Sequence, residues 1–326
     1  MRSQAAETAP LLGFHDLGHE GEDFRVAALA GLAQPQKQLP AKFFYDARGS
    51  QLFDQICELP SYYPTRTEIG LLQRHAGEIA EAAGRDAILV EFGSGSSRKV
   101  RILLDALEAP AGYVPIDISR AHLMSAAQAL AEDYPELPVL AICADYTRDF
   151  ALPDDLPEGL PLGFFPGSTL GNFAPAEAAR FLKRIAGLVG PGGGLLIGID
   201  LQKDEAILHA AYNDPEGVTA AFNLNLLQRM QRELGAELDL AGFRHEAHYN
   251  RARGCVEMHL VSRRRQRIVI GDRGFDLEQG ETIHTEDSRK YTLDSFRAQA
   301  QAAGWRPLEA WVDDRRLFSL HYLVAA

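Results

Sequence analysis

The chain has 326 residues, 46% of them apolar, and a formal net charge of −12 at pH 7. This length is sufficient for one large α/β domain or for two domains. The acidic balance argues against a nucleic-acid partner, which requires clustered Lys and Arg. The one dense basic run, "SRRRQR" at 262–267, is expected to be a solvated strand end. No apolar run reaches the roughly 18 residues that a membrane span needs.

Three cysteines, Cys57, Cys143 and Cys255, are widely spaced and form no Cys-x-x-Cys pair or Cys/His cluster. We therefore expect reduced thiols, no metal and a cytoplasmic protein. The N-terminal "MRSQAAETAPLLGFHDL" lacks the long apolar segment of a signal peptide. A monomer is expected rather than an oligomer.

Residues 1–40 are polar and punctuated by Pro and Gln, which predicts a loosely structured arm with residues 1–9 disordered. A helical pattern over 67–83 then ends at Gly84. The apolar run 87–92 is typical of a strand buried on both faces. The segment "GSGSS" and the helical pattern "RKVRILLDALEA" follow it, so a Gly-rich loop lies at a strand–helix corner.

Strand and helix patterns alternate from 87 to 201. The later strands are "GYVPIDIS", "PVLAICADY", "PLGFFPGST" and "GGGLLIGIDL", and the helices between them include "RAHLMSAAQALAEDY" and "APAEAARFLKRIAGLV". This order predicts an α/β fold with a doubly wound, Rossmann-like parallel sheet. Ligands bind such sheets at the carboxyl ends of the strands.

The alternation stops after residue 201. Residues 203–240 are mostly helical in pattern, 243–270 are strand-like, and the chain closes with a helix and a hairpin turning at "DDRR". We interpret 202–286 as an insertion that packs with the N-terminal arm. The expected division is 62–201 plus 287–326 for a sheet domain, and 10–61 plus 202–286 for a smaller α+β substrate-binding domain.

The residues at the strand ends indicate which nucleotide the sheet binds. The loop that contains Gly93 and Gly95 is expected to supply free backbone N–H groups at a helix start, but Arg98 occupies the place of the third glycine in a dinucleotide fingerprint, which weakens an NAD interpretation. Asp117 can accept both ribose hydroxyls, and Asp145 beside Tyr146 suits an adenine. Three successive strands thus end in an acid, the first being Glu91. The pattern resembles class I S-adenosylmethionine methyltransferases, because an acid-lined site favours a sulfonium and an ammonium over a pyrophosphate.

Further segments resemble one family, the histidine Nα-methyltransferases of ergothioneine biosynthesis. They are "FFYDARGSQLFDQICELPSYYPTRTE" (43–68), "VEFGSGSSRKVRILLDAL" (90–107), "YVPIDIS" (113–119), "FFPGSTLGNF" (164–173), "LLIGIDLQKDEAILHAAYND" (195–214), "GVTAAFNLNLLQRMQREL" (217–234) and "IHTEDSRKY" (283–291). The resemblance implies S-adenosylmethionine as methyl donor, no metal, and L-histidine with its mono- and dimethyl forms as substrates. It implies three methyl transfers to the α-amino group, which give hercynine.

The resemblance also implies site residues. The donor contacts would be Glu91, Gly93, Gly95, Lys99, Asp117, Asp145 and Tyr146. Tyr45 and Phe53 would line the methyl-transfer site. The substrate-binding residues would be Tyr62, Gly167, Thr169, Asn172, Tyr212, Met258, Glu286 and Ser288. Among these, Asn172 and Tyr212 would fix the α-carboxylate and amine, and Glu286 with Ser288 would meet the imidazole.

Glu286 and Ser288 are two residues apart, so on a strand they share a face. Together they can satisfy both imidazole nitrogens, whereas an indole has only one N–H to offer. Three alternatives stay open at this point. They are an N-methyltransferase of another aromatic amino acid or amine, such as a tryptophan derivative, an NAD-type oxidoreductase, and a non-catalytic ligand-binding module. The motif "RHEAHY" at 244–249 has the wrong spacing for a zinc helix, and the other histidines are expected to be structural.

Overall fold

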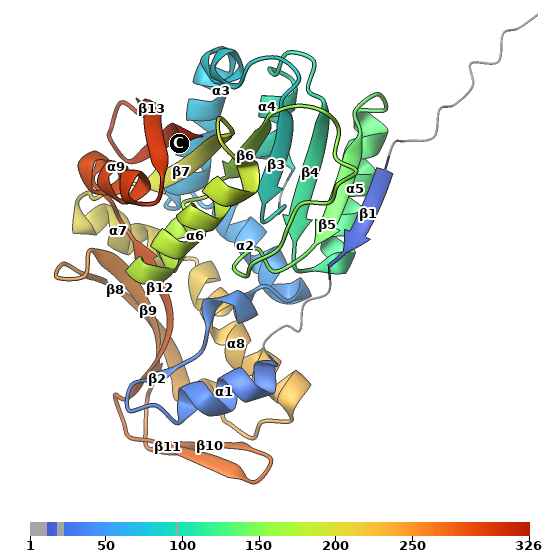
Figure 1. Cartoon of the computed structure of the whole chain (residues 1–326). Coiled ribbons are helices and arrows are strands. Elements are labelled where there is room, and N and C mark those ends of the chain that lie inside the picture. The colour runs from blue at the N-terminus through green and yellow to red at the C-terminus, as the bar shows by residue number, and fades with distance from the viewer. Residues whose placement is uncertain (1–11, 18–22, 96) are drawn as a thin grey trace, which may run out of the picture.

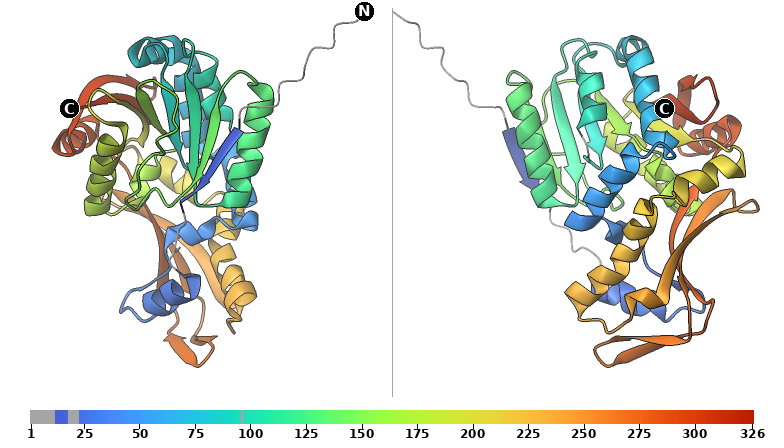
Figure 2. Two further views of the ribbon diagram at one scale, coloured as in Figure 1. Left: turned by 45° about the vertical axis from the view of Figure 1, so that its right-hand side comes forward. Right: turned by 180° about the vertical axis from the view of Figure 1, so that it is seen from behind.

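The computed structural model describes residues 12–17, 23–95 and 97–326. The expectation that residues 1–9 are disordered lies outside these ranges. Figure 1 shows two units, a large sheet covered by helices and a smaller unit below it. The small unit combines N-terminal segments with segments from residues 205–289. Figure 2 shows from two further sides that both units face a common boundary.

The large sheet has eight strands in the order β1-β5-β4-β3-β6-β7-β14-β13. Neighbours from β1 to β7 are parallel, while β14 and β13 run antiparallel and close one edge. The strands are β1 (Leu12–Asp16), β3 (Ile88–Phe92), β4 (Gly112–Asp117), β5 (Val139–Cys143), β6 (Pro161–Phe165), β7 (Gly194–Asp200), β13 (Trp305–Val312) and β14 (Phe318–Ala325). This confirms the predicted doubly wound α/β sheet and its closing hairpin.

Helices cover both faces of this sheet. One core joins its first face to α3 (Tyr63–Ala83), α4 (Arg98–Leu104) and α5 (Arg120–Asp133). The other core joins the opposite face to α6 (Pro175–Val189) and α9 (Leu293–Ala302). Alternate residues of β3 enter the two cores, Leu89 the first and Val90 the second, as the period of a strand requires. Strand β3 lies between β4 and β6, so the strand order reverses at its carboxyl end, where such sheets bind ligands.

The smaller unit has a four-stranded sheet in the order β2-β12-β9-β8 and a separate hairpin, β10–β11. Its core combines Phe24 and Phe44 from the N-terminal segment with Leu226 and Met258 from the later one. Its elements are α1 (Phe24–Leu32), β2 (Lys37–Gln38), η1 (Ala41–Phe44), α2 (Ala47–Glu58), α7 (Glu205–Tyr212), α8 (Val218–Leu234), η3 (Leu240–Gly242), β8 (Phe243–Asn250), β9 (Cys255–Ser262), β10 (Gln266–Ile270), β11 (Arg273–Leu277) and β12 (Thr282–Arg289). A short helix η2 (Thr169–Asn172) belongs to the large-sheet unit and contacts β12.

Two expectations about segment boundaries need correction. The N-terminal arm is not loose where the structure describes it, because β1 pairs in parallel with β5 and α1 packs into the smaller core. β1 occupies the otherwise open edge of the sheet, where unpaired backbone groups are available. Residues 12–16 therefore lie with the large sheet and not with the substrate-binding unit. The expected boundary at 286/287 also falls inside β12, which continues to Arg289.

Within the described ranges, the helices include none that is both long and apolar enough to cross a membrane.

The packing of β7 against α3 gives a test of the fold. A Cβ added at Gly198 would lie 2.2 Å from Oε1 of the buried Glu68 and 3.0 Å from the Phe318 ring. We expect Gly198→Ala to lower the free energy of unfolding by about 1–3 kcal/mol, because the site has no room for the methyl group. Urea denaturation measures the change.

Gly187→Ala is the matched control, because its Cβ on α6 would meet nothing within 4 Å. It should be neutral or stabilise the helix by about 0.5–1 kcal/mol. A Gly198→Ala protein as stable as wild type would contradict the packing described.

Candidate active site

A cavity lies at the boundary between the two units. Its walls come from α2 and the residues flanking it, from the loop after β6, and from α7, α8, β9 and β12. All ten predicted acceptor-side residues line it: Tyr45, Phe53, Tyr62, Gly167, Thr169, Asn172, Tyr212, Met258, Glu286 and Ser288. Residues separated by more than 200 positions in the chain thus meet in one place.

Aromatic rings form one side of the cavity. The Tyr45 and Phe53 rings are 5.6 Å apart at their centroids, and those of Tyr62 and Tyr212 are 6.3 Å apart, both edge-on. Phe222 on α8 completes the group, 5.8 Å from Tyr45 and 6.1 Å from Phe53. Ring faces carry negative charge density, so such a group can stabilise a cationic nitrogen by about 0.5–2 kcal/mol.

Glu286 is the buried acid of the cavity. Glu286 is 9% exposed, and its Oε1 accepts a hydrogen bond from the Asn172 Nδ2 amide at 3.0 Å. Burial raises the pKa of the Glu286 carboxyl to about 7. The group can therefore hold or release a proton near neutral pH.

Lys290 supports the neighbouring hydroxyl groups. Its Nζ donates to the Tyr212 and Ser288 hydroxyls at 2.8 Å each and pairs with Asp200 Oδ2 at 2.7 Å. The Tyr212 and Ser288 oxygens are 2.7 Å apart, so a single hydrogen bond joins them. Because an ammonium group only donates, the two hydroxyls retain both of their own protons. One proton lies between them, and the other is available to a ligand in the cavity.

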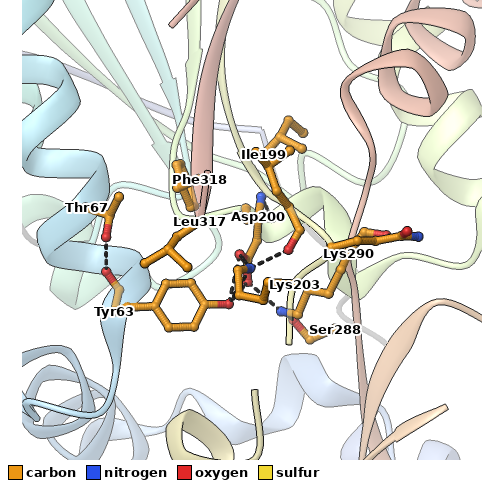
Figure 3. A network of polar contacts seen from close by, with 12 residues as sticks. Tyr63, Thr67, Ile199, Asp200, Lys203, Ser288, Lys290, Leu317 and Phe318 are labelled. Atoms are coloured by element: carbon orange, nitrogen blue, oxygen red, sulfur yellow. Dashed lines mark hydrogen bonds and ion pairs between the residues drawn. The ribbon is translucent and has the colours of Figure 1, made fainter. Parts of the chain in front are cut away.

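Asp200, at the end of β7, is the centre of a buried polar network (Figure 3). Its carboxylate accepts from the Tyr63 hydroxyl at 2.8 and 2.9 Å and from Lys203 Nζ at 2.5 Å. Burial alone would raise the pKa of Asp200. The adjacent charges of Lys290 and Lys203 instead keep this pKa below its usual value. Burial opposes protonation of Lys290 as well, yet Asp200 raises the pKa of that ammonium group. Lys203 differs, since burial lowers its pKa to about 8.

The donor-side residues lie at the carboxyl ends of β3, β4 and β5. Gly93 has φ +79°, and a Cβ there would lie 3.5 Å from the Tyr146 hydroxyl. Glycine therefore leaves open the space between the loop and this ring. Its N–H donates to the Ile116 carbonyl at 2.8 Å, which ties the loop to β4, and the Gly95 N–H donates to the Gly93 carbonyl at 2.9 Å. The free N–H groups expected of this loop are therefore not those of the two glycines. Gly95 follows in the same loop, and no atom lies within 4 Å of its added Cβ.

The acids beside this loop form a cluster. Burial raises the pKa of Asp117, and the charges of Asp117 and Asp145 add to the burial that raises the pKa of Tyr146. Glu91 accepts a hydrogen bond from the Tyr113 hydroxyl, and burial raises its pKa to about 7. This open, acid-lined corner fits a cationic nucleoside such as S-adenosylmethionine.

Glu68 connects the donor side to the acceptor side. The side chain is fully buried, pairs with Lys99 Nζ at 2.6 Å, and accepts from the Gly167 N–H at 2.9 and 3.0 Å. Lys99 stands on α4, just after the Gly-rich loop, and Gly167 lines the cavity. Lys99, which we expected at the donor, thus also holds the residue that positions the cavity loop.

Four functional residues escaped the sequence analysis: Glu68, Asp200, Phe222 and Lys290. Two had a usable signal. Asp200 is the last residue of a strand, as Asp117 is. Lys290 lies two residues after Ser288, which itself lies two residues after Glu286, so all three share the alternation of a strand. Glu68 was missed because, in the amphipathic pattern of α3, it cannot be told from the other polar residues of the helix. Phe222 was indistinguishable from core residues, and it also stacks on Phe44 at 4.4 Å.

Lys290→Met tests the buried network. Removing the ammonium group leaves Asp200 buried with less compensation, so we expect the free energy of unfolding to fall by about 3–5 kcal/mol. Lys183→Met, on the exposed side of α6, is the control and should change stability by less than about 0.5 kcal/mol. Equal stability of both variants by chemical denaturation would show that the ion pair does not hold the two units together.

Comparison with known proteins gives a consistent result. The family model described as "Histidine-specific methyltransferase, SAM-dependent" matches residues 24–325. A histidine N-alpha-methyltransferase of Mycobacterium tuberculosis is 42% identical over 313 residues, covering 93% of this chain and 96% of the relative. Ergothioneine biosynthesis protein 1 of Neurospora crassa is 32% identical over 306 residues. That match covers 88% of this chain but only 33% of the longer relative.

A more distant relative is a 4-dimethylallyltryptophan N-methyltransferase of Arthroderma benhamiae. It is 28% identical, and the match covers 86% of this chain and 87% of the relative. The matched family model spans both units of the structure, including the cavity between them. The chain therefore belongs to the histidine-specific, S-adenosylmethionine-dependent methyltransferases.

Proposed function

We propose that this protein transfers three methyl groups from S-adenosylmethionine to the α-amino group of L-histidine. The product would be hercynine, Nα,Nα,Nα-trimethyl-L-histidine, and the reaction the first step of ergothioneine biosynthesis. The observation that carries the proposal is the cavity that Glu286 and Ser288 line together with the aromatic rings. The similarity to a histidine N-alpha-methyltransferase over 93% of the chain supports it.

Imidazole recognition follows from the proton arrangement. A neutral imidazole has one N–H donor and one acceptor nitrogen. Glu286 accepts from the N–H, and Ser288 donates its hydroxyl proton to the other nitrogen. Lys290 donates to the Ser288 oxygen, and when Tyr212 also gives its proton to that oxygen, the Ser288 proton is free for the imidazole nitrogen. An indole has no acceptor nitrogen and would leave the Ser288 proton unpaired, which costs about 1–3 kcal/mol.

The other cavity residues orient the amino-acid end. Asn172 and Tyr212 hydrogen-bond the α-carboxylate and amine, while Met258 packs beside the imidazole ring. Gly167 and Thr169 shape the loop between donor and acceptor, and the Thr169 hydroxyl holds its turn by donating to the Pro166 carbonyl at 3.0 Å. The α-nitrogen must be neutral to act as a nucleophile, held about 3–3.5 Å from the methyl carbon. Tyr45 or a water would relay each departing proton.

The aromatic group accounts for the third transfer. Each methyl group makes the α-nitrogen more bulky, and the last leaves it with a fixed positive charge. Tyr45, Phe53 and Tyr62 line the cavity on the side where such a nitrogen would lie. Their rings stabilise that charge without forming a hydrogen bond, which a trimethylammonium group cannot make.

When bound, S-adenosylmethionine supplies the methyl group as an electrophile. The residues that would hold it are Glu91, Gly93, Gly95, Lys99, Asp117, Asp145 and Tyr146. Asp117 would accept from the ribose hydroxyls, and Asp145 with Tyr146 would hold the adenine. The acid cluster attracts the positive charges of the donor. Family membership removes the NAD-type oxidoreductase from consideration.

One relative supports a second class of methyl acceptor. The 4-dimethylallyltryptophan N-methyltransferase shares the length of the chain at 28% identity, so a tryptophan derivative is the alternative substrate. A ligand-binding module without activity is separated from both by a turnover assay. We further propose a monomer in the cytoplasm. The three free cysteines support the reducing compartment.

Mass spectrometry of the purified protein with S-adenosylmethionine and each of histidine, tryptophan, tyrosine and phenylalanine tests the reaction. We expect a gain of three methyl groups on the α-nitrogen of histidine and little on the others. Methylation of tryptophan in preference to histidine would favour the alternative. Donor binding without methylation of any amino acid would move the acceptor elsewhere.

Glu286→Ala tests imidazole recognition. The variant loses a charged acceptor, so histidine affinity should fall about 10–100-fold, which corresponds to about 1.5–3 kcal/mol. Donor affinity should stay nearly unchanged, because Glu286 lies on the acceptor side. Calorimetric titration with each ligand measures both. Unchanged histidine affinity would refute the assigned role.

Glu286→Gln tests the buried carboxyl by pH. The folded protein holds this proton up to pH about 7, whereas the unfolded chain releases it near the usual value of 4.5. The folded state therefore binds more protons between these values, and the Glu286 contribution to stability falls as pH rises. Without ligand, wild type should lose stability relative to Glu286→Gln from pH 4.5 to 7, on the order of 3 kcal/mol. Parallel denaturation curves across this window would contradict the raised pKa.

A further inference from the structure

Three histidines gather on the face of the small sheet that points away from the cavity. Met258 on β9 lines the cavity, so its neighbours Glu257 and His259 point to the opposite face. His248 on β8 lies opposite Glu257, and His284 on β12 lies opposite His259. None of these residues belongs to the methyl-transfer site described above.

His248, Glu257 and His259 present ligand atoms to a common point. The three ligand atoms lie within 4.8 Å of one another. Glu257 Oε2 is 3.2 Å from His248 Nε2 and 3.5 Å from His259 Nε2, and the two imidazole rings stack 5.1 Å apart. Two ligand atoms on a tetrahedral Zn²⁺ lie about 3.4 Å apart, because the bonds are about 2.0–2.2 Å long. The two carboxylate–imidazole distances match that spacing. The rings are stacked 11° from parallel, so the exposed His248 ring has to turn for both Nε2 atoms to point at one metal.

The ligand atoms are also available. His259 is 8% exposed, and neither of its ring nitrogens has a hydrogen-bond partner, which is costly for a buried imidazole. Glu257 uses its other oxygen, Oε1, to accept from Asn250 at 2.9 Å and from Arg253 at 2.5 Å. These contacts fix the carboxylate with Oε2 directed at the histidines, as outer residues fix a metal ligand. The His248 side chain is 49% exposed, so solvent reaches the point where the three meet.

We propose that His248, Glu257 and His259 form a site for a divalent transition metal of the Zn²⁺ type. Two imidazoles and one carboxylate are a ligand set that Zn²⁺ accepts, with water in the fourth position. His284 is not a ligand, because its Nε2 is engaged by Asp287 Oδ1 at 2.9 Å. The metal joins β8 to β9 behind Met258, so it braces the sheet that carries the cavity wall and takes no part in methyl transfer.

Calorimetric titration of the untagged, chelator-treated full chain with Zn²⁺ tests the proposal. We expect wild type to bind one Zn²⁺ per chain at this site and to gain thermal stability. His248→Ala should weaken the binding about tenfold or more, since it removes one of three ligands. His209→Ala, which removes an exposed histidine on α7, is the matched control and should bind as wild type does.

Glu257→Gln is the second variant, and it should also weaken Zn²⁺ binding while retaining the amide oxygen for Asn250. Thermal unfolding without metal shows whether each variant is folded. Absence of Zn²⁺ binding by wild type would overturn the proposal. So would equal affinities in wild type, His248→Ala and Glu257→Gln, because the metal would then bind elsewhere. A Co²⁺ complex with the weak absorption of octahedral geometry would also contradict the three-ligand tetrahedral site.

Discussion

The buried ion pair between Asp200 and Lys290 holds the two units of this protein in register. The chain leaves the large sheet at Asp200 and returns at Lys290, so the pair lies where both crossings meet. Backbone hydrogen bonds join the same two segments. The Tyr291 N–H donates to the Asp200 carbonyl at 3.0 Å, and the Gln202 N–H donates to the Tyr291 carbonyl at 2.8 Å. The same ammonium group then reaches the Tyr212 and Ser288 hydroxyls. Folding of the crossover and proton placement in the cavity therefore depend on one contact.

A second buried charge links the two ligand sites. Glu68 joins Lys99, which follows the Gly-rich loop, to the backbone of Gly167 in the cavity wall. One buried carboxylate on α3 thus supports both the start of α4 and the cavity wall. The geometry gives a physical route by which the donor side and the acceptor side can influence each other.

The sequence predicted the large sheet well because its strands are nearly continuous apolar runs separated by helical patterns. It also predicted which residues meet in the cavity, since the ten acceptor-side residues were carried over from a resemblance that extends along the chain. Strand β1 was missed because its five residues, LGFHD, show no strand pattern, and only the open edge beside β5 makes them a strand. Contacts such as Glu68 with Gly167, 99 positions apart, follow from tertiary packing and leave no local pattern.

The charges of the two ends of the site differ in a way that suits the proposed chemistry. Near the Gly-rich loop the acids Glu91, Asp117 and Asp145 outnumber the cations beside them, Lys99 and Arg148, so a positively charged donor is attracted there. Around the cavity the only cation in direct contact with the lining hydroxyls, among the described residues, is Lys290, and it shares the Asp200 carboxylate with Lys203. Asp200 therefore weakens the repulsion between Lys290 and a product that bears a fixed positive charge. Glu286, with a pKa of about 7, can be neutral or negatively charged near neutral pH, where an imidazole can be neutral or positively charged. When it is negatively charged, Glu286 offsets part of the fixed positive charge of the trimethylated form.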